Sequence, residues 1–116
     1  LDWSGIVALG TDCPVEDINP FKTFYAAVAR KVPGDQFSKA FQPRNALSRY
    51  EALLGLTRWA AYANFEDNEK GSIEVGKFAD FIILDQDIMQ VEIESVPNTR
   101  IVATLLNGKI VFSNRL

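Results

Sequence analysis

The sequence contains no histidine, and its 116 residues include a single cysteine, Cys13. A zinc site normally takes several of its ligands from histidine and cysteine, so this chain cannot form a typical zinc site by itself. Serine–histidine and cysteine–histidine catalysis are excluded for the same reason. A disulfide within the chain is excluded as well, which favours a reducing compartment, and we therefore expect a cytoplasmic location.

Long apolar runs and clusters of basic residues are also lacking. No apolar run approaches the about 20 residues that a membrane-spanning helix needs, and residues 81–84, for example, are strand-sized. Lysine and arginine are scattered along the chain, the formal net charge is -3 and the pI is about 4.9. Because nucleic-acid binding depends on concentrated positive charge, we expect neither a membrane nor a nucleic acid as a partner.

The beginning of the chain has the pattern of a strand, a loop and a helix. Residues 5–10 are apolar and rich in β-branched side chains, which predicts a buried strand. Asp12 then lies just past the carboxyl end of that strand. Asn19 and Pro20 are typical of a helix start, and Pro33-Gly34 of the region after a helix end. Since a domain rarely begins with a core strand, we expect a further part of the polypeptide upstream.

A second helix and a β-rich region follow. Ser48 and Glu51 have the spacing of a capping box, which predicts a helix that begins at Ser48. From Gly71 onward the sequence predicts short strands, over residues 78–84, 100–106 and 110–113. Asn107-Gly108 predicts a tight hairpin turn between the last two. We therefore divide the chain into a helical part, residues 1–66, and a β part, residues 67–116.

Several of these segments resemble the amidohydrolase superfamily, and within it the amidohydrolase-3 group. The first is Gly10-Thr11-Asp12-Cys13-Pro14-Val15, followed by Asn19-Pro20-Phe21 and a helix. The second is the glycine-containing stretch 71–81, and the third is the ending 104–111. The resemblance covers nearly the whole chain in the expected order, so the chain is identified as the C-terminal part of such an enzyme.

The resemblance implies an α+β composite: the last strand and helices of a (β/α)8 barrel, followed by part of a small β-sandwich. It implies a parent enzyme that uses a divalent metal, with zinc the leading candidate, to hydrolyse a C–N bond in a small amide-type substrate. Asp12 matches the aspartate at the end of the last barrel strand, which makes it both a catalytic residue and a metal ligand. Active sites of such barrels lie at the carboxyl ends of their strands.

Two departures from the family pattern change the expected activity. Cys13 replaces the usual aromatic residue beside the aspartate, and we expect it to be a small buried residue. The histidine-bearing strands that would complete the metal site are absent from this sequence. We therefore expect no cofactor in this chain alone and no activity in the isolated chain.

Other interpretations of these residues are structural. Asp12 could serve only to cap a turn before Pro14. Lys77 and Asp80 are best explained as residues that flank a strand, and the acidic side chains between 85 and 94 as a solvated surface. The chain as a whole could be a structural or interaction module that self-associates through an exposed sheet edge and helix faces. It could also be a subunit that completes a separately encoded barrel.

Overall fold

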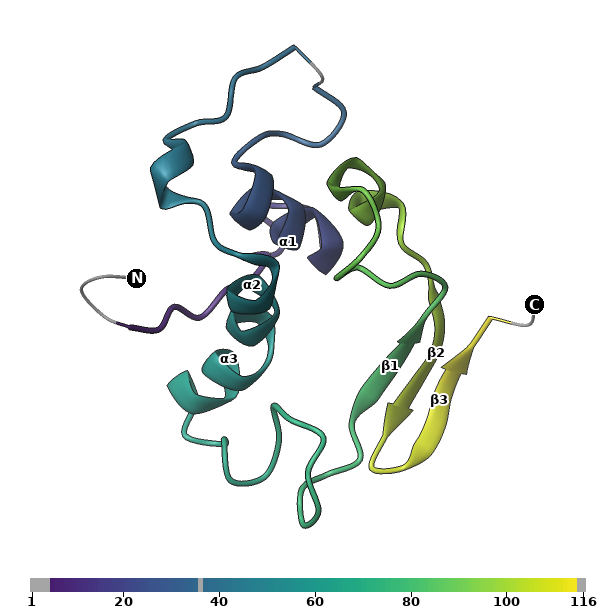
Figure 1. Cartoon of the computed structure of the whole chain (residues 1–116). Coiled ribbons are helices and arrows are strands. Elements are labelled where there is room, and N and C mark those ends of the chain that lie inside the picture. Colours follow the sequence, from purple (N-terminus) through teal and green to yellow (C-terminus); the bar gives the residue numbers. More distant parts are fainter. Residues whose placement is uncertain (1–4, 36, 115–116) are drawn as a thin grey trace.

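The computed structural model describes residues 5–35 and 37–114 and has an α+β fold, as the sequence predicted. The helices gather on one side of the molecule and a three-stranded sheet lies on the other (Figure 1). The elements in chain order are α1 (Pro20–Ala29), η1 (Pro43–Asn45), α2 (Arg49–Leu56), α3 (Arg58–Ala63), β1 (Phe81–Leu84), η2 (Ile93–Asn98), β2 (Ile101–Leu106) and β3 (Lys109–Ser113), where η marks a 3-10 helix. No helix in the described part of the chain is long and apolar enough to cross a membrane.

Helix α1 begins where the sequence predicted and ends earlier. The side chain of Asn19 accepts a hydrogen bond from the backbone N–H of Phe21, and Pro20 occupies the first helical position. The helix ends at Ala29 because Arg30 takes up a left-handed conformation, with φ of 56°, and donates its N–H to the carbonyl of Ala26. Pro33-Gly34 therefore lies beyond the helix end and does not cause it.

The second predicted helix is two helices. Ser48 caps α2 through the predicted capping box, in which its hydroxyl accepts from the backbone N–H of Glu51 and its N–H donates to the Glu51 carboxylate. The helix breaks at Thr57, whose hydroxyl donates to the carbonyl of Leu53 and whose backbone leaves the helical region. The chain is less buried toward the end of α3, where Tyr62 and Ala63 are exposed.

The sheet is antiparallel, with the strands in the order β1-β2-β3. Phe81 pairs with Leu105, and Leu105 with Ile110, so these apolar side chains lie in one row across the sheet. The turn between β2 and β3 has positive φ at Asn107 (48°) and Gly108 (75°), which confirms the predicted hairpin.

One hydrophobic core joins the helices to the connection between β1 and β2. Phe24 on α1, Ala52 on α2 and Val96 in η2 have no exposed surface. Arg49 at the start of α2 donates to the carbonyls of Ile88 and Val91, at 2.6 Å each. The core therefore contains residues from before and after the predicted boundary near residue 66, and the division into 1–66 and 67–116 stays a prediction.

Residues 5–10 do not form the predicted strand. They run without regular secondary structure along α2, and the three residues Ile6, Val7 and Ala8 are exposed. A strand requires a neighbouring strand to receive its backbone hydrogen bonds, and the only sheet in the described residues is β1-β2-β3. The segment is apolar, as predicted, but the described residues contain no neighbouring strand with which it could pair.

Candidate functional site

The loop that carries Asp12 is preceded by a segment that lies against α2. The backbone N–H of Leu9 donates to the carbonyl of Gly55, at 2.9 Å. The segment lies so close to the helix that a Cβ atom at Gly55 would be 2.8 Å from Cγ of Leu9 and 3.0 Å from the carbonyl oxygen of Val7. Glycine at position 55 is therefore what allows residues 7–9 to pack against α2 and fixes the start of the loop.

The Asp12 loop ends at the start of α1, where a second set of contacts fixes it. Asp17 accepts a hydrogen bond from the backbone N–H of Asn19 and forms an ion pair with Lys22. The hydrogen bond from Lys22, with that from the Asn19 N–H, holds the pKa of Asp17 below its usual value. This ion pair was not predicted, although an acidic residue just before a helix start and a lysine in its first turn are compatible with such a contact.

Asp12 lies in the middle of this loop, exposed to solvent. Its backbone has φ of 51°, and its carbonyl oxygen accepts the N–H of Val15 at 2.8 Å, which closes a turn. The Asp12 carboxylate forms no hydrogen bond or ion pair with the described residues. The main chain of Asp12 thus makes the turn, and its side chain is not the turn cap that the structural interpretation required.

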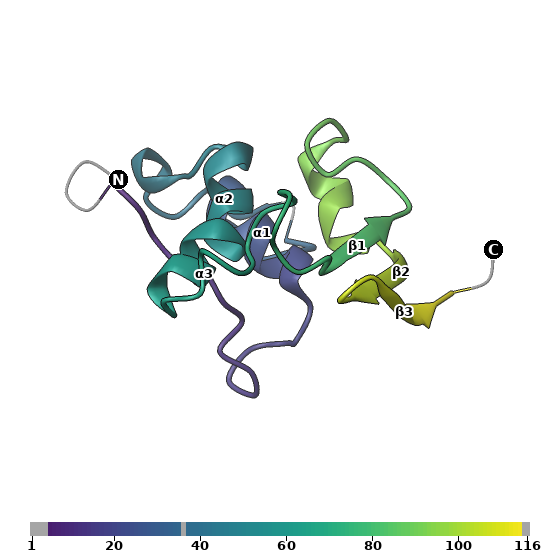
Figure 2. The ribbon, with the colours of Figure 1, turned by 90° about the horizontal axis from the view of Figure 1, so that it is seen from below.

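Cys13 is exposed, and the expectation that it would be buried is wrong. Figure 2 shows why: the segment that leads into α1 loops away from the helices, so no other part of the described chain covers it. Val15 and Ile18 in the same loop are also exposed, at 76% and 74%. The loop thus presents a carboxylate, a thiol and two aliphatic side chains on an open face.

The residues around Asp12 do not form a complete metal site. No group of three or more cysteine, aspartate or glutamate side chains that could hold a metal ion exists within residues 5–35 and 37–114. The Asp85 carboxylate instead accepts two hydrogen bonds from Arg100, one from the side chain at 2.8 Å and one from the backbone N–H at 2.9 Å. Asp87 accepts the N–H of Met89. Asp85 and Asp87 thus make local structural contacts, and Glu92 and Glu94 are exposed, as expected for a solvated surface.

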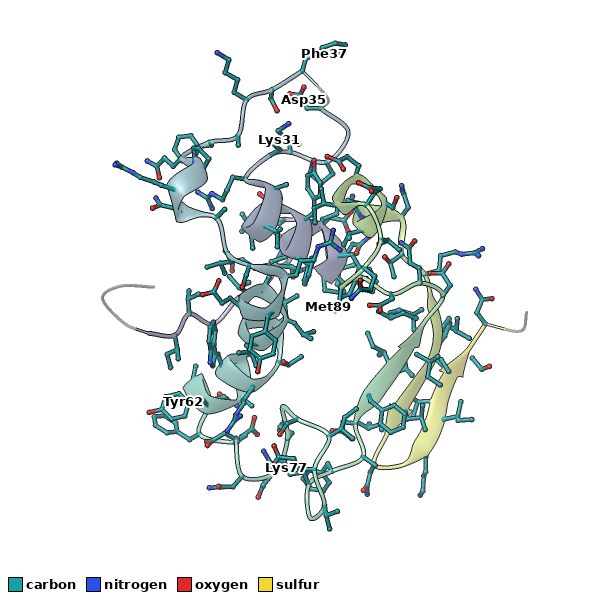
Figure 3. The ribbon with its side chains drawn as sticks, in the orientation of Figure 1. Lys31, Asp35, Phe37, Tyr62, Lys77 and Met89 are labelled. Carbon is teal, nitrogen blue, oxygen red and sulfur yellow. The ribbon has the colours of Figure 1, made fainter. Side chains whose placement is uncertain are left out.

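Lys77 and Asp80 are likewise committed to structural contacts. The Lys77 ammonium donates to the carbonyl of Asp67 at 2.6 Å and to the Ser72 hydroxyl at 2.7 Å, and Figure 3 shows it within the connection that leads to the sheet. Asp80 accepts the backbone N–H of Asn107 at 2.7 Å and so supports the hairpin turn. The two side chains thus stabilise different parts of the β region.

A hollow of about 590 Å³ between the end of α2, α3 and β1 carries polar side chains as well. Glu66 binds the Asn64 amide at 2.6 Å and the Lys70 ammonium at 2.9 Å. The hydrogen bond from Asn64, followed by the hydrogen bond from Lys70, lowers the pKa of Glu66. The same contact with Glu66 raises the pKa of Lys70. Glu66 and Lys70, two of the charged residues that line this hollow, are thus paired with each other.

The chain matches the model of the amidohydrolase family over residues 4–112. Protein LONG AFTER FAR-RED 3 of Arabidopsis thaliana is 36% identical over 112 residues, which are 97% of this chain and 19% of that protein. The putative amidohydrolase YtcJ of Bacillus subtilis is 29% identical over 92% of this chain and 20% of its own length. N-substituted formamide deformylase of Arthrobacter pascens is 30% identical over 93% of this chain and 19% of its own length.

The chain thus spans about a fifth of the length of these relatives. No solved structure matches it with significance. Because the family model covers nearly all of its residues, the chain belongs to the amidohydrolase family.

Proposed function

We propose that this chain is the C-terminal part of a metal-dependent amidohydrolase that hydrolyses a C–N bond in a small amide-type substrate. Within that enzyme, residues 5–10 form the last strand of a (β/α)8 barrel, and Asp12 stands at its carboxyl end. The β part contributes to a small β-sandwich. The isolated chain is inactive, because the nitrogen ligands for the metal come from the remainder of the polypeptide.

The observation that carries this proposal is the open face formed by residues 5–12. Ile6, Val7 and Ala8 are apolar and exposed, yet the backbone beside them is held against α2 by the Leu9–Gly55 hydrogen bond. An apolar segment with one face packed and the other open is suited to pairing with further strands. Asp12 follows directly, with its carboxylate exposed and uncommitted.

We assign Asp12 the role of general base and acid. A carboxylate positioned beside an attacking water can accept its proton and return that proton to the leaving nitrogen of the substrate. Asp12 offers one oxygen ligand for a divalent metal, and the described residues supply no group of ligands that would complete the site. When bound, the metal would increase the acidity of the water.

A chimera tests this assignment. The corresponding fifth of the Arthrobacter pascens N-substituted formamide deformylase is replaced by this chain, and deformylation is measured with and without added divalent metal. We expect activity that requires metal and falls about 1,000-fold or more in Asp12→Asn, since general acid–base catalysis contributes 10²–10⁴-fold. Glu16→Gln in the same exposed loop is the matched control and should leave the rate unchanged.

Two results would overturn the proposal. The first is full activity in a folded, metal-containing Asp12→Asn chimera, as judged by circular dichroism and metal content. The second is metal-dependent amidase activity in the isolated chain.

A non-catalytic role in self-association is the second candidate, and strand β3 supports it. All five of its residues are exposed, with Ile110 at 66%, Val111 at 60% and Phe112 at 49%. An apolar edge strand of this kind can pair with a second copy. Light scattering over a range of concentrations decides between the two candidates: a stable dimer that Val111→Lys abolishes would favour this role, and a monomer would eliminate it.

A further inference from the structure

The loop between α1 and η1 is closed at its base by its own backbone. The N–H of Phe41 donates to the carbonyl of Arg30 at 2.8 Å, and the Arg30 side chain donates back to the carbonyl of Phe41 at 3.1 Å. Compact loops of roughly 6–16 residues whose ends are tied in this way are often functional. We call residues 30–35 and 37–44 the basic loop.

The tip of the basic loop is shaped to present an aromatic side chain. The Asp35 carboxylate accepts the backbone N–H groups of Phe37 at 3.1 Å and Ser38 at 3.0 Å, which orders the turn. Phe37 is 98% exposed, and Figure 3 shows it at the far end of the loop, directed away from the helices. Val32 and Phe41 are exposed as well. A loop with an ordered tip that exposes three large apolar side chains indicates a contact surface.

The basic loop also concentrates unpaired positive charge. It contains four of the twelve cationic residues of the chain, Arg30, Lys31, Lys39 and Arg44, and only one of the fifteen acidic residues, Asp35. The side-chain ion pairs among the described residues use the cations at positions 22, 70, 77 and 100, and none of those in the basic loop. Lysine and arginine are scattered over the chain as a whole, but the basic loop carries more positive than negative charge.

The charged and apolar groups share one surface. A hollow of about 370 Å³ is lined by side chains of both kinds, among them Arg30, Lys39, Val32 and Phe41, together with the one acidic residue of the loop, Asp35. The Arg30 guanidinium lies over the Phe41 ring, 5.8 Å from its centre. Cations beside exposed phenylalanine and valine match the interface of an anionic bilayer, where the cations meet lipid headgroups and the apolar side chains enter the acyl boundary.

We propose that the basic loop binds the surface of a lipid bilayer that contains anionic lipids. The positive charge of the loop is complementary to the headgroups, and Phe37 inserts at the interface. This proposal departs from the expectation of no membrane partner, which depended on the lack of a run long enough to span a membrane. Surface binding through a loop needs no such run, and the net negative charge of the rest of the chain limits contact to this projecting loop (Figure 1).

Vesicle co-sedimentation tests the proposal with the whole 116-residue chain. We expect binding to phosphatidylglycerol-containing vesicles, weakened by added salt, and no binding to phosphatidylcholine vesicles. Phe37→Ser should weaken binding about 10-fold, since burial of one phenylalanine is worth at least that factor. Lys39→Gln should weaken it about 5-fold, as expected for one cation near an anionic surface.

Two controls carry the same changes outside the loop. Phe65→Ser removes a phenylalanine that is 94% exposed, and Lys109→Gln removes an exposed lysine. Both should bind as the unmodified chain does, and circular dichroism should show all five proteins equally folded. Equal binding to neutral vesicles, equal losses in loop and control variants, or binding to immobilised polyglutamate without binding to vesicles would each overturn the proposal.

Discussion

The core around α1, α2 and η2 and the segment before α1 are built in opposite ways. In the core, Phe24 and Val96 are fully buried and side-chain hydrogen bonds reinforce the packing. In residues 5–12, the side chains of Ile6, Val7, Ala8 and Asp12 are exposed, and the backbone N–H of Leu9 donates to the carbonyl of Gly55 on α2. The core is closed to solvent, whereas residues 5–12, which we call the open segment, present apolar side chains to it.

This contrast separates what stabilises the chain from what would make it an enzyme. Changes in the core should alter the free energy of unfolding strongly, and changes in the open segment should alter it little. The catalytic contribution of the open segment should appear only when other strands cover it.

The largest effect is expected at the centre of the core. Phe24→Ala removes a fully buried ring from the contact between α1 and η2 and should lower the free energy of unfolding by about 3–5 kcal/mol. Urea denaturation measures this loss. Phe37→Ala removes the same ring from an exposed position and should change the value by less than about 0.5 kcal/mol. Equal losses in the two variants would contradict the assignment of the core.

Arg49 should give the next largest effect, because it joins α2 to the connection between β1 and β2. Arg49→Met removes two hydrogen bonds and leaves the carbonyls of Ile88 and Val91 without this donor. We expect a loss of about 2–3 kcal/mol, measured by urea denaturation, since a hydrogen bond from a charged group is worth about 1.5–3 kcal/mol. Arg58→Met, at the exposed start of α3, is the control, and a loss of the same size there would refute the role of Arg49.

Gly55 lies where the open segment meets α2, and its substitution tests the contact between the two. Gly55→Ala favours the helix by about 1 kcal/mol but brings a Cβ against Leu9 and Val7. We expect the helix gain to be cancelled and the Leu9 amide to exchange its hydrogen faster, as measured by NMR. The double variant with Leu9→Ala removes the side-chain clash and should recover part of the stability. An unchanged Leu9 amide in Gly55→Ala would contradict the close contact.

Local chemistry was enough to predict several elements of the fold. Asn19-Pro20 and the Ser48–Glu51 capping box predicted two helix starts, and Asn107-Gly108 predicted the hairpin, because each depends on residues close together in the sequence. The strand at residues 5–10 and the burial of Cys13 depend on distant partners, and both predictions were wrong for this structure. The break at Thr57 and the helix η2 depend on packing and were not predicted.

The candidate site could also be predicted from the sequence only in part. Asp12 was identified through its resemblance to a family motif, and its role stays a prediction. The contacts that hold its loop, Leu9 with Gly55 and Asp17 with Lys22, join residues whose proximity only the folded chain establishes.

The smallest predicted effect concerns acid stability. The backbone N–H of Ser48, with its hydroxyl, holds the pKa of Glu51 below the ordinary value of 4.5. Glu51 therefore contributes stability above that value, and the contribution is lost as the pH falls through the lowered pKa of the folded state. Between neutral pH and about pH 3, the urea midpoint of Glu51→Gln should change less than the urea midpoint of the unmodified chain. The exposed Glu69→Gln should retain the full change, and an equal change in both variants would contradict the capping contribution.

Hydrogen exchange at residues 7 and 8 tests the central claim most directly. In the isolated chain, the Val7 and Ala8 amides should exchange rapidly, because no strand pairs with them in the described structure. In the deformylase chimera, the same amides should be protected by neighbouring barrel strands, in step with the appearance of metal-dependent activity. Rapid exchange of both amides in an active chimera would contradict the claim that this open segment is the last strand of an amidohydrolase barrel.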